Sequence, residues 1–523
     1  MQARRLSIIT GIVVSVALLL GLLLVQVWLS DKQRSAVNKD LPPLELTMVL
    51  PSPADTGPST SDPDRVRTVI ESKFHVKLNL IAWPRGRDYQ TKYVSMLMAN
   101  NAPDFAIDLS PDGGSSLILN GVYADLSSFV SPASMPNYFK YWMTEHELRQ
   151  YQLHNQFVRA PVPYDRNVYR SYYIRKDWLE RLSLPVPESY EQYVETLRAF
   201  TFRDPDGNGQ QDTYGFSTSG NGKQISEEWP EYVKNDLLYP AYMENNRLVD
   251  MKTDPRISRV IDDILSLMKE GLSDPDWFLN QDNEHIEKAV QGRVGIVMGN
   301  TRDFAFDSNP FSLQARGKKA NASADWIPFT PFGANRPLGT AIEASSPFVF
   351  LKTNADKHPE KVSKLIEILD WLCGEEGYLL SHYGLEGQHY TRSGNIITLL
   401  PDASAMTGRG GASSVWSFFT PEAPSVLGLT VIDPRMTEHD KTVADFLVRL
   451  PVKEKLGTFL IPPQEIDVGA FRDKLDEYQI RMLYSDKSGQ RWPEYRKELM
   501  DNYNGDVILR HYENQVRTAR GTK

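Results

Sequence analysis

Cysteine is almost absent from this chain of 523 residues, which contains only Cys373. A single cysteine excludes disulfide bonds within the chain and any metal cluster built from several thiolates. Cys373 recurs with Ile366, Leu369 and Leu372 at the spacing of one helix face. We therefore expect Cys373 to be a small buried hydrophobic residue.

An excess of positive charge is also missing. The 58 Lys and Arg residues face 67 Asp and Glu residues, which gives a formal net charge of -9. Nucleic-acid binding needs a clustered basic surface for phosphate contacts, so this composition argues against a nucleic-acid partner. The length predicts two large lobes or domains, because one hydrophobic core rarely extends over so many residues.

The motifs of common catalytic sites are missing as well. The nine histidines form no HExxH or HxH pair, no GxSxG is present, and GNGK at 220–223 is followed by Gln224 rather than Ser or Thr. Metalloprotease, serine-hydrolase and phosphate-loop chemistry therefore lack support. A glycosidase-type pair of carboxylates stays open, because counting acidic residues does not show which ones meet. We expect no enzyme, with a polysaccharide-degrading enzyme as the alternative.

Long apolar runs are confined to the N-terminus. Arg4 and Arg5 precede an uncharged apolar run from Leu6 to Leu29, which as a helix would be roughly 36 Å long and would cross a bilayer. Positive residues before such a span stay inside, so the rest of the chain is expected on the extracellular face of the cell membrane.

A cleaved signal peptide is the alternative for this segment. Its cleavage needs small residues at positions -3 and -1, but cuts after residues 30 and 36 place Trp28 and Arg34 at -3. The segment also has no cysteine that accepts a lipid. We expect residues 1–35 to form a membrane anchor or signal segment and residues 36–43 to form a tether.

Strand and helix patterns alternate after the tether. Strands are predicted at 44–50, 76–80 and 105–109, with helices at 63–74 and 88–99 between them. This alternation predicts a parallel α/β sheet, whose ligands gather at the carboxyl ends of the strands. These ends fall near Pro51, at 82–85 and at 109–114. Further on, we predict helices at 258–272 and 358–380, a turn at Gly384 after the second of these, and a strand at 292–298.

Residues 204–215 read DPDGNGQQDTYG, which is typical of a calcium loop. Oxygen-bearing side chains occupy alternate positions, and Gly209 stands at the sixth position, where such a loop turns sharply. Gly215 replaces the twelfth-position glutamate, so this is not a complete EF-hand. Asp212, the Gln210 carbonyl and Thr213 are expected to close a structural site. An ion-free turn is the alternative, since Asp and Gly favour turns.

Several segments resemble the large extracellular solute-binding proteins of ABC sugar importers, especially those of Gram-positive bacteria. The segments follow the family order and together span most of residues 44–510. They are NAPDFAIDLS at 101–110, YYIRKDWLERLSLPVPESYEQYVETLRAF at 172–200, the loop DPDGNGQQDTYG, KEGLSDPDWF at 269–278, VQGRVGIVMGN at 290–300 and HPEKVSKLIEILDWLCGEEGYLLSHYGLEGQHY at 358–390.

The resemblance implies an α/β, two-lobed type 2 periplasmic-binding-protein fold, which in this chain follows the N-terminal transmembrane helix predicted from the apolar run. It implies an N-lobe of 44–165 plus 296–342 and a C-lobe of 166–295 plus 343–523, with crossings near 160–170, 295 and 343. The lobes would close on an oligosaccharide by hinge motion. The protein, a monomer, would deliver the sugar to an ABC permease.

The resemblance also implies a set of calcium ligands. In family members similar to alginate-oligosaccharide binders, the first, third, fifth, seventh, ninth and tenth loop positions hold calcium. The corresponding residues of this chain are Asp204, Asp206, Asn208, Gln210, Asp212 and Thr213. Thr213 stands where an acid often appears.

One departure from the family concerns anchoring. Gram-positive members are usually lipoproteins with a cysteine after the signal segment, whereas this chain has an apolar span and no such cysteine. A helix tethers a protein to the membrane as a lipid does. The departure also leaves open a surface sugar sensor that feeds a two-component kinase.

Aromatic residues are plentiful, with ten Trp and 24 Tyr, and their rings suit stacking on sugars. Trp83 follows the second predicted strand, and Trp229 follows a Gly- and Ser-rich segment; both are candidate ligand contacts. Asp108 and Ser110 close the third strand and are candidate hydrogen-bond partners. Packing or turn capping is the alternative for each. Weaker candidates are Trp326, Tyr390 and Trp416, while Trp178 and Trp371 are expected in cores.

Overall fold

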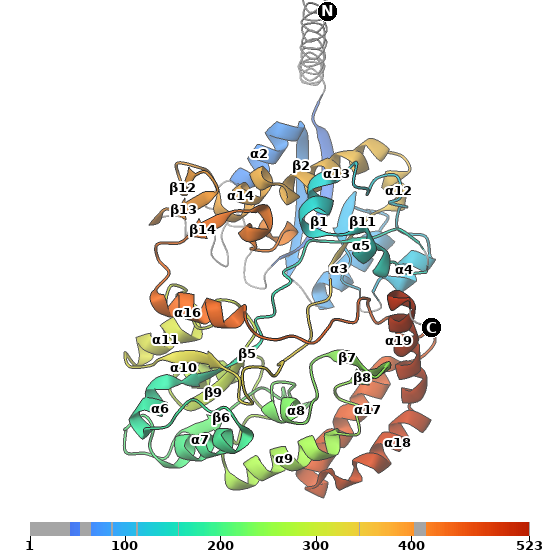
Figure 1. Cartoon of the computed structure of the whole chain (residues 1–523). Helices are drawn as coiled ribbons and strands as arrows, with labels where there is room; N and C mark the ends of the chain where they lie inside the picture. The colour runs from blue at the N-terminus through green and yellow to red at the C-terminus, as the bar shows by residue number, and fades with distance from the viewer. Residues whose placement is uncertain are drawn as a thin grey trace, which may run out of the picture.

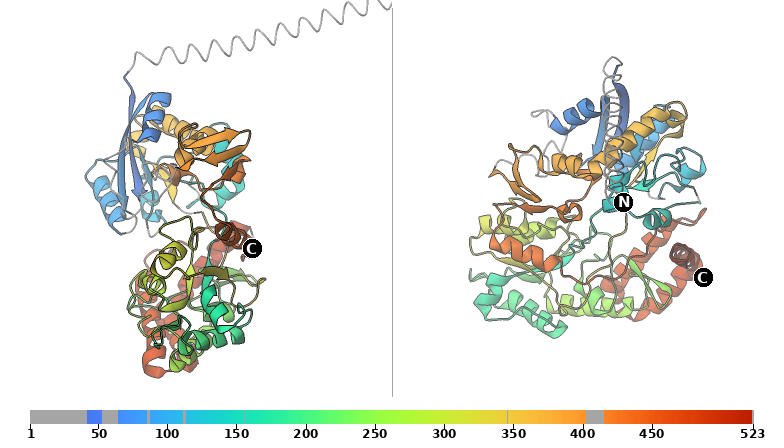
Figure 2. Two further views of the ribbon diagram at one scale, coloured as in Figure 1. Left: turned by 90° about the vertical axis from the view of Figure 1, so that its left-hand side faces the viewer. Right: turned by 45° about the horizontal axis from the view of Figure 1, so that its top comes forward.

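The structure, a computed structural model, describes residues 42–52, 64–84, 87–110, 113–154, 156–344, 346–401 and 415–521. It has two lobes, one above the other, joined by a narrower middle (Figures 1 and 2). The first lobe comprises residues 44–162 and 347–432, and the second comprises residues 171–338 and 438–521.

A five-stranded sheet in the order β2-β1-β3-β11-β4 forms the centre of the first lobe. β1 pairs in parallel with β2 and with β3, which confirms the prediction from the alternating patterns. β11 is antiparallel to β3 and to β4. The crossovers run through α2 and α3. The bounds are β1 Leu44–Ser52, α2 Arg65–Phe74, β2 Val76–Pro84, α3 Arg87–Met98, β3 Phe105–Ile107, β4 Ala160–Pro161 and β11 Pro347–Phe350.

Both faces of this sheet are buried, because successive side chains of a strand point to opposite faces. Met48 and Leu50 of β1 pack into the larger core of the lobe. Val49 between them packs with Tyr89 and Ala106 on the other face. Helices therefore cover the sheet on both sides, and the strand ends remain as the places where polar side chains gather.

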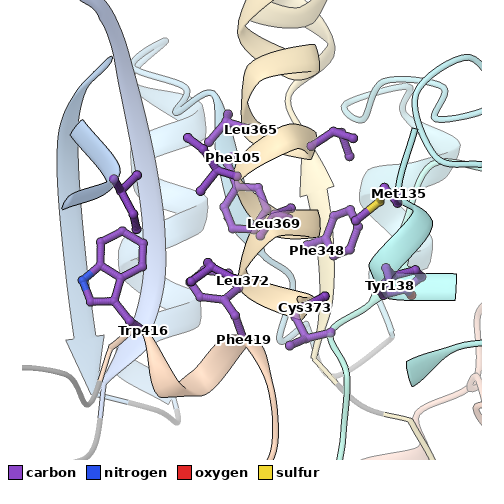
Figure 3. Close-up of a cluster of buried hydrophobic side chains, with 14 of the residues drawn as sticks. Phe105, Met135, Tyr138, Phe348, Leu365, Leu369, Leu372, Cys373, Trp416 and Phe419 are labelled. Atoms are coloured by element: carbon purple, nitrogen blue, oxygen red, sulfur yellow. The ribbon is translucent and has the colours of Figure 1, made fainter. Parts of the chain in front are cut away.

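Helix α13 (Pro359–Cys373) covers the larger-core face of the sheet (Figure 3). Leu365, Leu369 and Leu372 point from it toward Phe105 and Phe348. Cys373 is 2% exposed in the same core, which confirms its predicted role as a buried small residue.

The helix predicted over 358–380 is broken in two at Gly374. Helix α14 (Glu375–Tyr383) begins directly afterwards, and Gly384 forms its C-cap as the sequence predicts. The two helices approach so closely that a Cβ at Gly377 would lie 2.3 Å from the Trp371 carbonyl oxygen. Glycine is therefore required at the start of α14, and this close approach is not visible in the apolar pattern.

A four-stranded sheet in the order β10-β5-β9-β6 forms the centre of the second lobe. β5 is antiparallel to β9 and β10, and β6 is parallel to β9. The strand predicted at 292–298 is β9. The bounds are β5 Ser171–Arg175, β6 Tyr214–Phe216, β9 Val294–Gly299 and β10 Trp326–Phe329.

Helices surround this second sheet (Figure 1). Helix α9 (Ile257–Glu270) buries Val260, Ile261, Ile264 and Leu267 along one face and ends at Gly271, whose φ of 73° suits glycine. The other long helices of the lobe are α6 Lys176–Leu182, α7 Tyr190–Phe202, α10 Glu284–Val290, α11 Leu313–Ala320, α16 Glu438–Leu447, α17 Val468–Arg481, α18 Trp492–Asn502 and α19 Gly505–Arg520.

Shorter elements complete both lobes. The first lobe adds a three-stranded sheet β12-β13-β14, and the second adds the hairpin β7-β8. The bounds are α4 Ser115–Leu119, η1 Tyr138–Trp142, α5 Glu145–Gln150, α8 Pro230–Lys234, β7 Ala241–Glu244, β8 Arg247–Asp250, α12 Lys352–Ala355, β12 Tyr390–Ser393, β13 Ile396–Leu399, η3 Ser417–Phe419, η4 Pro424–Leu427, β14 Thr430–Ile432, η5 Met482–Asp486 and η6 Gly489–Arg491.

The lobe boundaries differ from those expected. Residues 296–342, expected in the N-lobe, contribute β9 and β10 to the sheet of the second lobe. Residues 347–432, expected in the C-lobe, contribute β11, α13 and α14 to the first lobe. Both segments show the apolar patterns of strands and helices. Such a pattern predicts the type of element, but it does not predict which of the two sheets a strand pairs with.

Among the described residues, three segments cross between the lobes, at 162–170, 339–346 and 433–437. The first two agree with the expected crossings near 160–170 and 343. No crossing lies near 295, because β9 pairs with β5 and β6 on both sides. The crossing between β14 and α16 was not expected, since its short polar segment resembles an ordinary helix connection.

The apolar run Leu6–Leu29, expected to span the membrane, lies outside the described residues. Within the described ranges, no helix is both long enough and apolar enough to cross a bilayer.

Candidate functional site between the lobes

The carboxyl ends of β1, β2 and β3 lie at the edge of the first sheet from which the crossing segments leave. The Asp108 backbone N–H donates to the Pro347 carbonyl, and the Val162 N–H donates to the Ser346 carbonyl. In the second lobe, the crossing segment 162–170 enters β5 at Ser171, which pairs with Gly299 at the carboxyl end of β9. In both sheets, the carboxyl ends of the parallel strands therefore adjoin the junction between the lobes, and these ends are where ligands of α/β sheets usually bind.

Trp83 and Ser110 lie at this edge of the first lobe, and both are partly exposed. The Trp83 ring meets Tyr89 edge to face, with ring centroids 6.0 Å apart. Ser110 Oγ accepts from Gln90 Nε2 at 2.8 Å and keeps its own proton for another acceptor. Their roles as ligand contacts stay predictions that this placement favours.

Asp108 is only 3% exposed, and its carboxylate is already used by the protein. Oδ1 accepts from the Ser110 backbone N–H at 2.9 Å, and Oδ2 accepts from the Tyr123 hydroxyl at 3.0 Å. A Cβ at Gly114 would lie 2.0 Å from Oδ2. Asp108 therefore shapes the turn that follows β3, which is the alternative that the sequence left open.

Trp229, Trp326 and Tyr390 lie away from the junction surface. Trp229 and Trp326 are 0% exposed, and Trp229 packs between Phe216 and Trp277 in the core of the second lobe. Tyr390 is 5% exposed and lines a cavity of about 280 Å³ whose wall comes from the first lobe alone. These aromatic side chains pack within lobes, because the sequence shows an aromatic residue but not the direction it faces.

The neighbour of Trp229, Glu228, was not predicted as a candidate, although it lies at the junction. Its side chain is 26% exposed. The Tyr172 hydroxyl donates to the Glu228 carbonyl at 2.9 Å, and Arg170 of the crossing segment donates to the Glu227 carbonyl at 2.6 Å. The Gly- and Ser-rich stretch 217–227 before Glu228 is the available signal in the sequence.

An ion pair joins the two lobes directly. Arg302, three residues after β9, lies 3.6 Å from Glu422, which stands between η3 and η4 of the first lobe. Their side chains are 40% and 59% exposed, respectively. Sequence reasoning missed both residues, since one charged residue in a loop carries no local signal.

Two buried hydroxyl groups lie near this ion pair. Tyr378 and Tyr383 of α14 are at most 2% exposed, and neither hydroxyl makes a hydrogen bond. Burial raises the pKa of both, and Glu422 raises it further while Arg302 lowers it. The phenols therefore stay neutral inside the core of the first lobe.

A second polar group holds the crossing segments together. Glu147 accepts from Arg166 at 2.6 Å and lies 3.3 Å from Lys455. Although desolvation opposes it, the hydrogen bond and charge of Arg166 lower the pKa of Glu147 to about 2. Tyr151 donates to Glu343 Oε2 at 2.6 Å, and the Gly457 N–H donates to Glu343 Oε1 at 2.8 Å. These bonds tie segment 448–466 to the first lobe and to a crossing segment.

The predicted calcium loop lies in the second lobe between α7 and β6. Asn208 Nδ2 is 3.0 Å from Asp206 Oδ2 and 3.2 Å from Asp212 Oδ1, so two carboxylates face one point. The Asp204 carboxylate accepts from the backbone N–H groups of Asn208 and Gly209. Gly209 has a φ of 77°, which fits the sharp turn expected at this position.

The donor types fit a hard cation, with three carboxylates, an amide and a backbone carbonyl in one loop. In this conformation, however, the described residues contain no group of three or more His, Cys, Asp or Glu side chains placed to hold a metal ion. Gln210 is exposed. Thr213 is 3% exposed, and its hydroxyl donates to the Phe200 carbonyl at 2.7 Å, so only its backbone carbonyl remains as a ligand.

No family model matches the chain. The polygalacturonan/rhamnogalacturonan-binding protein YtcQ of Bacillus subtilis is 23% identical over 361 residues, which cover 63% of this chain and 64% of YtcQ. Lipoprotein LipO of the same species is 24% identical over 43% of this chain and 45% of LipO. The fructooligosaccharide ABC transporter substrate-binding protein FusA of Streptococcus pneumoniae is 29% identical over 26% of this chain and 25% of FusA.

Each of these matches spans less than two thirds of the relative's length. Solved structures cover more of the chain. A solute-binding protein from Bifidobacterium longum infantis, described as HMO binding and ABC-transporter associated, covers 92% of this chain and 100% of its own, with a TM-score of 0.67 and 15% identity.

Two further structures concern calcium. The alginate-binding protein AlgQ2 without calcium ion covers 92% of this chain and 99% of its own, with a TM-score of 0.63 and 15% identity. An EF-hand mutant of S. pneumoniae FusA in complex with fructo-nystose covers 92% and 100%, with a TM-score of 0.63 and 16% identity. These comparisons confirm the resemblance to solute-binding proteins and the two-lobed mixed α/β fold. None of the proteins named here is described as an enzyme.

Proposed function

We propose that this protein is an extracytoplasmic solute-binding protein that captures an oligosaccharide between its lobes and delivers it to an ABC permease. The observation that carries the proposal is the arrangement of two α/β lobes whose sheets turn their ligand-favouring strand ends to one junction. Partly exposed Trp83 and Ser110 supply a stacking ring and a hydroxyl there. Stacking and hydrogen bonds hold a sugar without breaking any of its bonds.

The proposal includes the location and the partners. The chain acts as a monomer on the outer face of the cell membrane, held by its N-terminal segment, and a permease receives the sugar. The descriptions of FusA as an ABC transporter protein and of LipO as a lipoprotein support these assignments.

Glycan binding tests the function. The full-length protein in detergent is titrated with a panel of oligosaccharides by calorimetry, and each glycan is then analysed by mass spectrometry. We expect at least one glycan to bind and to be recovered intact. Shortened glycans would instead indicate a polysaccharide-degrading enzyme, and binding of none would contradict the proposal.

Trp83→Ala tests the position of the site. We expect it to lower glycan affinity by about fivefold, since an aromatic contact contributes roughly 1 kcal/mol beyond its buried area. Trp371→Ala is the matched control, because Trp371 is also partly exposed but packs edge to face on Phe74 within the first lobe. Equal effects of both substitutions would place the ligand elsewhere.

We also propose that residues 204–213 bind calcium as a structural ion. Asp204, Asp206, Asn208, Asp212 and the Gln210 and Thr213 carbonyls would hold it. A bound cation would draw together carboxylates that now repel each other: burial and the neighbouring Asp204 raise the pKa of Asp206. The AlgQ2 and FusA descriptions mention calcium and an EF-hand, which supports the assignment.

Calcium removal tests this site. Calcium at 100 times its Kd is expected to stabilise the fold by about 2.7 kcal/mol, so a chelator should lower the melting temperature. Asp206→Asn should abolish that difference, whereas Asp445→Asn, at a side chain 71% exposed on α16, should preserve it. If calcium does not change the melting temperature of the unsubstituted protein, the proposed site is contradicted and residues 204–213 form a turn without an ion.

A further inference from the structure

Glu228 is held in one position by the second lobe. Its Oε2 accepts from the Thr218 hydroxyl at 2.6 Å, and its backbone N–H donates to Ser226 Oγ at 3.3 Å. Thr218 itself is 0% exposed and lies just beyond the carboxyl end of β6. A carboxylate fixed in this way has already lost its rotational freedom before any ligand arrives.

His285 stands behind this carboxylate. It is 3% exposed, and its Nδ1 lies 2.8 Å from Ser219 Oγ. Ser219 Oγ donates its only proton to the Asp282 carbonyl, so it accepts from Nδ1, and the ring proton is assigned to Nδ1. His285 Nε2 is then an acceptor that makes no hydrogen bond, although Glu228 Oε2 is 3.4 Å away.

The charge of Glu228 is not compensated by a cation. Burial lowers the pKa of His285, which outweighs the opposing effect of Glu228 and keeps the ring neutral. Within the described ranges, no Lys or Arg side chain forms an ion pair with Glu228. The unpartnered Nε2 shows that the ring does not neutralise the carboxylate. Glu228 therefore presents a negative charge at a partly exposed position.

One oxygen of Glu228 is left for a ligand. Oε2 is occupied by Thr218, whereas Oε1 makes no hydrogen bond with any described residue. The Tyr172 and Arg170 contacts place the backbone of residues 227–228 beside the crossing segment, so Glu228 lies at the lobe junction. A fixed anionic acceptor favours a donor such as a hydroxyl group and disfavours a second carboxylate.

We propose that Glu228 is a specificity-determining residue, whose free carboxylate oxygen accepts a hydrogen bond from a hydroxyl of a neutral sugar and disfavours uronate sugars. This inference rests on the proposed function and names the ligand class of the same site. It separates this chain from YtcQ, whose name describes the binding of acidic polysaccharides. Thr218 and His285 act as positioning residues that keep the carboxylate in place.

Glu228→Gln tests the proposal, because it keeps the side-chain shape and removes the charge. The full-length protein is titrated by calorimetry with neutral oligosaccharides and with oligogalacturonates. We expect the unsubstituted protein to bind a neutral sugar more tightly than any oligogalacturonate. We expect Glu228→Gln to weaken neutral-sugar binding by about 10-fold to 100-fold, the range for a hydrogen bond to a charged group. Its oligogalacturonate binding should be equal or tighter.

Two further variants separate specificity from folding. Glu227→Gln removes the same charge from the adjacent, partly exposed residue and should leave both affinities unchanged. Thr218→Val keeps the charge but releases the carboxylate, so it should reduce the preference for neutral over acidic sugars while thermal unfolding stays cooperative.

The outcomes distinguish the two proposals. Tighter binding of oligogalacturonates by the unsubstituted protein, or neutral-sugar affinity unaffected by Glu228→Gln, would overturn the role of Glu228 while glycan binding itself stood. If the unsubstituted protein bound neither sugar class, the proposed function would fail, and the role of Glu228 with it.

Discussion

At the scale of single residues, Glu231 shows how strongly the second-lobe core constrains a charge. It is 0% exposed in α8, and its Oε2 makes no hydrogen bond. Burial raises the pKa of Glu231 to about 8, with a smaller contribution from the Asp263 charge. The folded protein therefore keeps this carboxyl group protonated at neutral pH, whereas the unfolded chain ionises it near the ordinary value of 4.5.

Glu231→Gln should therefore change how stability depends on pH. A raised folded pKa gives stability that is full below pH 4.5 and is lost as the pH rises toward 8. That loss is roughly 5 kcal/mol for a shift of this size. The glutamine variant does not titrate, so its free energy of unfolding should fall less between these pH values. Denaturant unfolding at pH 5 and pH 8 measures the difference.

The control for this substitution is Glu195→Gln on the neighbouring helix α7, where the side chain is 60% exposed. It should leave the pH dependence of the free energy of unfolding unchanged. Parallel pH profiles for the unsubstituted protein and Glu231→Gln would show that the Glu231 carboxyl is not the source of the dependence.

The candidate site could be predicted from the sequence only in part, and the reason lies at this same scale. Trp83 and Ser110 could be placed at the lobe junction because a strand end fixes where a residue lies in the fold, whereas their contact with a ligand stays a prediction. Trp229 and Trp326 were misassigned, since an aromatic ring suits a core as well as a ligand. Glu228 and Arg302 were missed because their significance comes from partners distant in sequence, His285 and Glu422.

At the scale of elements, Asp370 joins two helices of the first lobe. From α13, its Oδ1 accepts from the backbone N–H groups of Asn137 and Tyr138, at 2.8 and 3.0 Å. Its Oδ2 accepts from Asn137 Nδ2 at 2.9 Å. The short helix η1 has no cap from its own N-cap side chain. A side chain from a distant helix therefore satisfies its free N–H groups.

Asp370→Ala should lower the free energy of unfolding by about 3 kcal/mol, because it leaves two backbone donors and one amide donor, each at least partly buried, without an acceptor. Asp370→Asn keeps one acceptor oxygen and should cost less. Chemical denaturation measures both, and Asp356→Ala, at a side chain 60% exposed, is the control. A cost for Asp370→Ala no larger than that of Asp356→Ala would contradict the capping role.

Elements with strong local patterns were predictable for a physical reason. β2 begins with alternating buried and exposed positions, and α9 repeats buried positions at helical spacing, so each pattern reflects the surface it covers. The break at Gly374 was not predictable, because it depends on the approach of α14 to α13 rather than on a missing apolar residue. The capping of η1 by Asp370 depends likewise on residues more than 200 positions apart.

At the scale of the whole molecule, the junction holds all the connections between the two lobes that the described residues make. Segments 162–170, 339–346 and 433–437 connect them, and Glu343 ties the second of these segments to Tyr151 and Gly457. The lobe boundaries were the least predictable feature. Strands β9 and β11 have similar apolar runs. The sequence pattern therefore does not predict which of the two sheets each strand joins.

The Arg302–Glu422 ion pair is the contact that we expect to bias the equilibrium between lobe arrangements. It joins the lobes at 3.6 Å between exposed side chains, a class of pair that contributes at most about 1 kcal/mol. Breaking it with Arg302→Ala or Glu422→Ala should therefore reduce the population of the present arrangement by up to about fivefold. The double exchange Arg302→Glu with Glu422→Arg should restore that population.

Fluorescence energy transfer between one dye on each lobe measures the population, and high salt should abolish the difference by screening. Lys497→Ala, which breaks an exposed ion pair within α18, is the control. A single-residue variant that leaves the lobe separation unchanged at low salt would show that the crossing segments alone set the arrangement.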